Sequence, residues 1–105
     1  VMREQYHKEQ FEKEVRDILQ EVFTLLSGKN EKYGNFALDP RPVLSGASPE
    51  TRILIRLDEK FSRLSQIVSE QPIDREAMYN ELVDIIGYKV LLIMHTRRND
   101  KKEQD

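Results

Sequence analysis

The residues best suited to chemistry are two carboxylates, Glu81 and Asp84, which stand three positions apart in the last third of the chain. On a helix, residues at this spacing lie on one face, about 5–6 Å apart, and Tyr88 continues the same stripe. Two carboxylates beside an apolar helix need a compensating positive charge. Mg²⁺ supplies one, because it prefers carboxylate oxygens and keeps several waters. The alternative is a solvated acidic edge that is salt-bridged to a lysine.

A second set of charged residues follows the spacing i, i+3, i+4 and i+7. It consists of Arg56, Glu59, Lys60 and Arg63, which share one helical stripe beside an apolar face. In a functional interpretation, Glu59 adds a third carboxylate to the metal. The three cations then hold phosphate oxygens. The alternative is ordinary pairing on a helix surface, with Glu59 bonded to Arg63.

A third set lies in the segment K-N-E-K-Y-G-N at positions 29–35. Lys29 and Lys32 beside a glycine suit a phosphate, and Tyr33 can stack on a base. The segment is not a P-loop, because no glycine stands five residues upstream of Gly28 and no Ser or Thr follows Lys29. The alternative is a hydrophilic turn. His7 and His95 lack metal-type spacing partners, and we interpret both as incidental.

Three helices must position these residues. Apolar residues at helical spacing predict a first helix from about Arg3 to Ser27, which Gly28 ends in a left-handed conformation. Residues 29–49 form a functional loop whose prolines prevent a continuous helix. A second helix begins with Ser48 as N-cap and ends before Pro72. A third begins near Asp74 and ends near Arg97, before a charged tail at 98–105.

The stretch Ile85–Met94 is apolar on almost all sides. A helix of this kind is surrounded in the folded protein, and two neighbouring helices cannot surround it well. We therefore expect a partner chain, in a homodimer or homotetramer whose interface includes this stretch.

Composition excludes several classes of protein. The chain has 105 residues, a net charge of −2 and no cysteine. This length predicts a single domain over residues 1–105. The absence of cysteine excludes disulfide scaffolds and Cys-ligated zinc, and favours a reducing, cytoplasmic compartment. We expect no membrane segment or signal peptide, and the charge balance argues against a duplex nucleic acid as partner.

The order of the three motifs resembles a family of small phage and bacterial proteins related to the all-α nucleoside triphosphate pyrophosphohydrolases of the MazG kind. The resemblance covers residues 29–95. Proteins similar to this superfamily bind Mg²⁺ with E-x-x-E on one helix and E-x-x-D on the next. Glu81 and Asp84 match the second motif, and Glu59 matches the last position of the first. Arg56 replaces the first Glu, as it tends to do in the small phage-type relatives.

The resemblance implies a MazG-like all-α domain whose core is completed by homo-oligomerisation. It also implies Mg²⁺-dependent binding of a nucleotide and cleavage of a (d)NTP to a (d)NMP and pyrophosphate. The expected catalytic residues and Mg²⁺ ligands are Glu59, Glu81 and Asp84. The expected substrate-binding residues are Lys29, Lys32, Tyr33, Arg56, Lys60, Arg63 and Tyr88.

Two alternatives remain open. One is a non-catalytic phage protein that sequesters a nucleotide in the host cytoplasm, for example against a defence system. The other is a helical adaptor whose charged stripes are only solvated faces.

Overall fold

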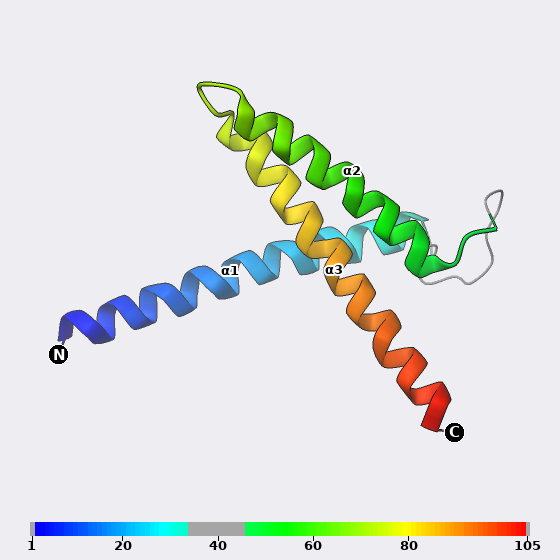
Figure 1. Ribbon diagram of the computed structural model, residues 1–105. Coiled ribbons are helices and arrows are strands. Elements are labelled where there is room, and N and C mark those ends of the chain that lie inside the picture. The colour runs from blue at the N-terminus through cyan, green and yellow to red at the C-terminus, as the bar shows by residue number, and fades with distance from the viewer. Residues whose placement is uncertain (1, 34–45, 105) are drawn as a thin grey trace.

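The computed structural model describes the backbone of residues 2–33 and 46–104, and the side chains of residues 7–31 and 46–98. These residues form three helices and no strand: α1 (Met2–Tyr33), α2 (Pro49–Ser69) and α3 (Arg75–Gln104) (Figure 1). The all-α class and the three helices predicted from the sequence are confirmed.

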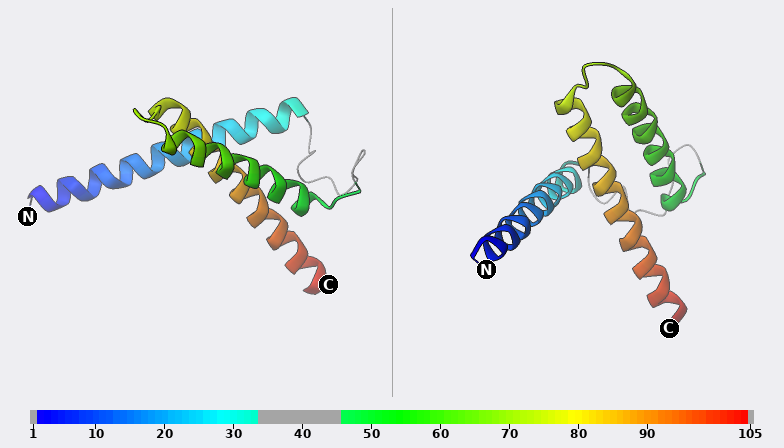
Figure 2. Two further views of the ribbon diagram at one scale, coloured as in Figure 1. Left: turned by 45° about the horizontal axis from the view of Figure 1, so that its top comes forward. Right: turned by 60° about the vertical axis from the view of Figure 1, so that its left-hand side comes forward.

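Helices α2 and α3 form an antiparallel hairpin, and α1 crosses α3 on a different side from α2 (Figures 1 and 2). The hairpin core contains Ile53 and Leu57 of α2 and Ile85 of α3, all buried, with Leu64 and Tyr88 packed against them. Among the described residues, α1 packs on α3 and not on α2. Helix α3 therefore links two helices that do not contact each other.

The starts of α2 and α3 agree with the sequence prediction. The Ser48 hydroxyl accepts a hydrogen bond of 3.2 Å from the backbone N–H of Thr51, and Pro49 is the first helical residue. At α3, the Asp74 carboxylate accepts a 3.0 Å bond from the N–H of Ala77. Each cap satisfies a backbone donor that has no partner within its helix.

The predicted end of the first helix is wrong. Helix α1 continues through Gly28 to Tyr33, and among the described glycines only Gly46 has a positive φ, of 68°. A glycine inside a helix costs only about 1 kcal/mol, and the lysines and glutamate that follow are good helix formers. Lys29 therefore lies on a helix rather than in a loop, whereas residues 34–45 of the predicted loop lie outside the described residues.

Helix α3 is also longer than predicted, since it runs past Arg97 to Gln104. The charged tail contains Arg, Lys, Glu and Gln, which all favour helix. Within the Ile85–Met94 stretch, Ile85 and Gly87 are buried, but Ile93 is 54% exposed. One chain thus leaves part of this stretch uncovered, and the expected oligomer stays a prediction.

The contact between α1 and α3 is close because it includes a glycine. A Cβ atom placed on Gly87 would lie 3.4 Å from Cδ2 of Leu26. Val22, one turn earlier on α1, is 3% exposed. The crossing therefore buries Val22 and partly buries Leu25 and Leu26 on one face of α1, whereas the residues before it extend past the hairpin (Figure 2).

Candidate functional site: an ion cluster joining three helices

Lys60 of α2 lies against the two carboxylates of α3. Its Nζ is 2.9 Å from Oδ2 of Asp84 and 3.4 Å from Oε2 of Glu81. The lysine follows Leu57 by three positions, so it shares the inner face of α2 with the hairpin core. The side chains of Lys60 and Glu81 are both 15% exposed. The acidic pair predicted from the sequence is thus balanced by a largely buried lysine.

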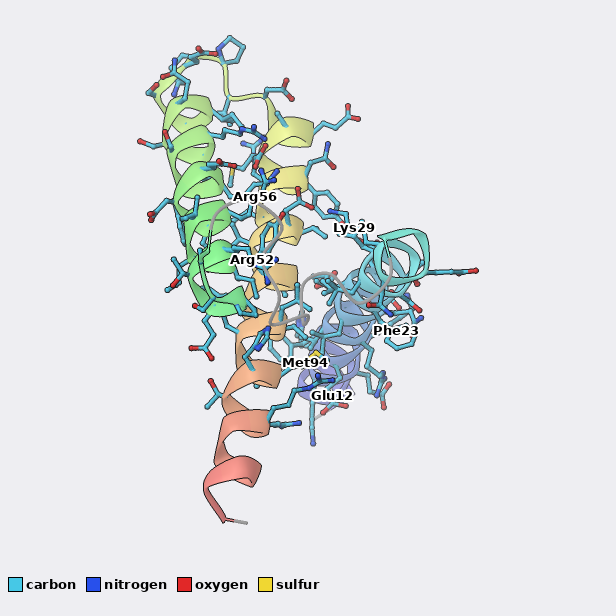
Figure 3. The ribbon with its side chains drawn as sticks, turned by 90° about the vertical axis from the view of Figure 1, so that its right-hand side faces the viewer. Glu12, Phe23, Lys29, Arg52, Arg56 and Met94 are labelled. Atoms are coloured by element: carbon cyan, nitrogen blue, oxygen red, sulfur yellow. The ribbon has the colours of Figure 1, made fainter. Side chains whose placement is uncertain are left out.

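Lys29 brings α1 to the same place. Its Nζ lies 3.9 Å from Oδ1 of Asp84, on the opposite carboxylate oxygen from Lys60. Figure 3 shows Lys29 at the end of α1 nearest the hairpin. The continuation of α1 beyond Gly28 is what places this lysine there. We call the four residues Lys29, Lys60, Glu81 and Asp84 the ion cluster.

The ion cluster is electrically balanced but not saturated with hydrogen bonds. Burial alone would lower the pKa of Lys60, but the hydrogen bond to Asp84 and the negative charges of Asp84 and Glu81 outweigh it, so its pKa is raised. Within the described structure, Oε2 of Glu81 is buried, and its 3.4 Å ion pair with Lys60 lacks good hydrogen-bond geometry. The cluster therefore retains acceptor capacity for a further ligand.

Glu59 does not join the acidic pair. It pairs instead with Arg56, at 3.2 Å between Oε2 and Nη1, and not with Arg63 as the alternative interpretation had it; both paired side chains are largely exposed. No three His, Asp or Glu side chains in the described ranges come together in a way that could hold a metal ion. The reason is helical geometry: Glu59 precedes Lys60 by one residue, or about 100° around the helix. When Lys60 faces α3, Glu59 faces away.

The other predicted residues are distributed around the ion cluster. Lys60 contacts carboxylates here, where the sequence had assigned it to a phosphate. Arg63 is exposed, and Tyr88 is half-buried against the hairpin core. The side chains of Lys32 and Tyr33 lie outside the described residues.

Arg52 was missed by the sequence analysis. Its Nε and Nη1 atoms are buried, and it precedes Arg56 by four residues. Figure 3 shows both arginines along the side of α2 next to α3. The spacing of four residues between Arg56 and Lys60, applied once more toward the N-terminus, predicts a cation at Arg52. The cationic stripe of α2 is therefore one turn longer than predicted.

The two histidines, interpreted as incidental from the sequence, differ in burial. His95 of α3 is 7% exposed, whereas His7 of α1 is exposed. Among the described side chains, neither histidine belongs to a group that could hold a metal ion.

Two further findings bear on function. Over the described part of the chain, each helix is too short or too polar to serve as a membrane span. Comparison of the chain with protein-family models, with curated proteins and with solved structures finds no match.

Proposed function

We propose that this chain binds a nucleotide through its phosphates, together with Mg²⁺, at the ion cluster of a MazG-like domain. One observation carries the proposal. The three motifs that support the resemblance lie far apart in the sequence, and each supplies a side chain to the same cluster. Lys29 comes from the first, Lys60 from the second, and Glu81 and Asp84 from the third. Independent helix-surface pairs would have no reason to converge in this way.

The residues present fit one Mg²⁺ but not the predicted set of three carboxylates. Mg²⁺ typically uses one or two carboxylates and fills its other positions with water and substrate phosphates. Glu81 and Asp84 provide two carboxylates on one helical face, and Oε2 of Glu81 has a 3.4 Å ion pair with Lys60 rather than a well-formed hydrogen bond. Bound there, Mg²⁺ would neutralise phosphate oxygens and lower the pKa of a bound water.

Lys60 has two successive roles in this proposal. In the free protein its ammonium group is the cation that balances the acidic pair. When a metal ion takes over that balance, the flexible lysine side chain can turn to a phosphate oxygen. Lys29 and Arg56 have side chains that are 49% and 62% exposed, so both can reach the same phosphates. The chain thus offers three cations to a polyanionic ligand.

The activity we propose is cleavage of a (d)NTP to a (d)NMP and pyrophosphate. Sequestration without cleavage is the second candidate, and the position of Glu59 favours it. With Glu59 paired to Arg56, one carboxylate fewer is available for a second metal ion. An arginine binds phosphate in the ground state as well as in the transition state. Arg56 would therefore support nucleotide binding both in an enzyme and in a sequestering protein. Substituting Arg56→Ala should weaken nucleotide binding by about 1.5–3 kcal/mol.

The test is a panel of nucleotides titrated calorimetrically into the protein with and without Mg²⁺, followed by analysis of the products. The informative variant is Asp84→Asn. The matched control is Asp17→Asn, because Asp17 also forms a 2.9 Å pair with a lysine, Lys13, but lies exposed on α1. We expect Mg²⁺-dependent binding that Asp84→Asn weakens at least about tenfold and Asp17→Asn leaves unchanged.

Pyrophosphate in the products identifies the enzyme, and intact recovered nucleotide identifies the sequestering protein. The proposal is wrong if no nucleotide binds, or if Asp84→Asn and Asp17→Asn bind equally well.

A further inference from the structure

The chain is far more extended than its length requires. Its radius of gyration is 17.4 Å, against about 13 Å for a compact domain of this length. Its accessible surface is 8757 Å², whereas a compact protein of this mass exposes roughly 6,100 Å². Each chain thus carries an excess of roughly 2,600 Å² of surface.

Apolar side chains on α1 account for a conspicuous part of this surface. Two phenylalanines, Phe11 and Phe23, are 66% and 64% exposed. Among the described side chains of this helix, the large apolar residues that are exposed are Phe11, Val15, Ile18, Leu19 and Phe23. The spacing of Phe11, Val15, Ile18 and the buried Val22 is that of one helical stripe. The stripe that packs on α3 therefore continues, uncovered, along the part of α1 that extends past the hairpin (Figure 2).

We propose that a second copy of this chain covers the exposed stripe of α1, through contact between the two α1 helices. The area supports this occupant. Permanent dimers bury about 1,000–2,500 Å² per partner, whereas weak transient complexes bury less than about 600 Å² per partner. The excess surface of the whole chain, roughly 2,600 Å², is large enough for an interface of the first class. A short peptide or a transient partner would leave most of it exposed.

The charges beside the stripe favour a copy of the same surface. At 100° per residue, the charged residues that flank the stripe include both signs: Lys8 and Glu12 on one side and Glu14 on the other. In a twofold contact a surface meets itself, so a border of one sign would repel its copy. A border of mixed sign brings opposite charges together when the two helices run antiparallel.

This inference places the main interface on α1, where the sequence had placed it on Ile85–Met94 of α3. It does not depend on nucleotide binding. It does affect the ion cluster, because α1 carries Lys29. A second copy that fixes the direction of α1 also fixes that lysine relative to Asp84.

The first experiment measures assembly of the full chain by sedimentation at micromolar concentration. We expect a dimer or larger assembly, and the double substitution Phe11→Gln/Ile18→Gln, at two exposed positions of the stripe, should raise its dissociation constant at least about 100-fold. The matched control is Ile93→Gln on α3, since Ile93 is 54% exposed. It should leave assembly unchanged. A monomeric wild-type chain, or an assembly weakened by Ile93→Gln alone, would overturn the proposal.

The second experiment keeps the wild-type stripe and uses the absence of cysteine in the chain. Single cysteines are introduced one at a time at the five exposed apolar positions of α1, and at Ile55 and Ile93 as controls on the other helices. Under mild oxidation we expect disulfide-linked dimers from at least one α1 position and from neither control. Cross-linking through position 93 but no α1 position would refute the α1 interface.

Discussion

Replacing Lys60 with methionine tests the ion cluster most directly. Methionine fills much of the same volume without the charge, so the variant isolates the electrostatic effect. It leaves Glu81 and Asp84 adjacent, with side chains only 15% and 23% exposed, and with Lys29 at 3.9 Å as the nearest remaining cation. Two neighbouring carboxylates in this setting repel each other and lose their main compensating charge.

The size of the loss follows from the degree of burial. Breaking an exposed pair costs about 0–1 kcal/mol, whereas breaking a fully buried one costs about 3–5 kcal/mol. The ion cluster lies between these limits, and Lys29 compensates for part of the lost charge. We expect Lys60→Met to lower the free energy of unfolding by about 2 kcal/mol at pH 7, or the melting temperature by about 10 °C.

The assay is urea and thermal unfolding followed by circular dichroism, at one fixed protein concentration because assembly affects apparent stability. Lys13→Met is the control, since it removes a lysine from an equally short but exposed pair, and it should change stability little. Added Mg²⁺ should restore Lys60→Met more than the wild type, because Mg²⁺ then replaces the missing cation. If Lys60→Met is as stable as the control and indifferent to Mg²⁺, our account of the cluster is refuted.

Three further predictions concern pH and the helices. The raised pKa of Lys60 means that its contribution to stability is complete below pH 10.5, the ordinary lysine value, and is lost as the pH rises through the higher pKa of the folded protein. The stability difference between wild type and Lys60→Met should therefore shrink above pH 10.5 in alkaline unfolding titrations; a constant difference would contradict it. Gly28→Ala should raise the free energy of unfolding by about 0.8–1 kcal/mol, because Gly28 is helical with open space at its Cβ position. A loss of stability in the same denaturant titration would show that the helix ends there after all. Ser48→Ala should cost about 1 kcal/mol through the lost bond to Thr51, whereas Ser48→Asp should retain most of the stability when the two variants are unfolded side by side.

The helix starts could be predicted from the sequence because their causes are local. Ser48 and Asp74 accept hydrogen bonds from residues three positions later, so a few adjacent residues contain the whole signal. The end of α1 could not be predicted in the same way. Gly28 has the right type for a helix stop, but a glycine is also tolerated inside a helix at a cost of about 1 kcal/mol, and the lysines and glutamate after it favour helix. A glycine therefore does not by itself tell a helix end from a helix interior.

The candidate site was predictable only within each helix. The spacing of Glu81 and Asp84 required a cation, but whether it would be a metal ion or a lysine depends on how α2 packs on α3. The sequence also grouped Glu59 with Lys60, although neighbouring residues on a helix face different directions once one of them is buried. Which residue turns inward is decided by Ile53 and Leu57, whose burial fixes the rotation of α2.

A small change in the angle at which α1 crosses α3, next to Gly87, displaces the far end of α1 by a much larger distance. Phe11 lies about fifteen residues from Leu26, or about 22 Å along the helix axis. Rotating α1 by roughly 10° about the crossing would therefore move Phe11 by about 4 Å. A Cβ on residue 87 would stand 3.4 Å from Cδ2 of Leu26, already in contact with it, so a side chain larger than alanine there would press on Leu26 and favour a changed tilt of α1. The volume of one residue in the middle of α3 thus sets the direction of a distant apolar surface, so substitutions there can retune association without altering any residue of that surface.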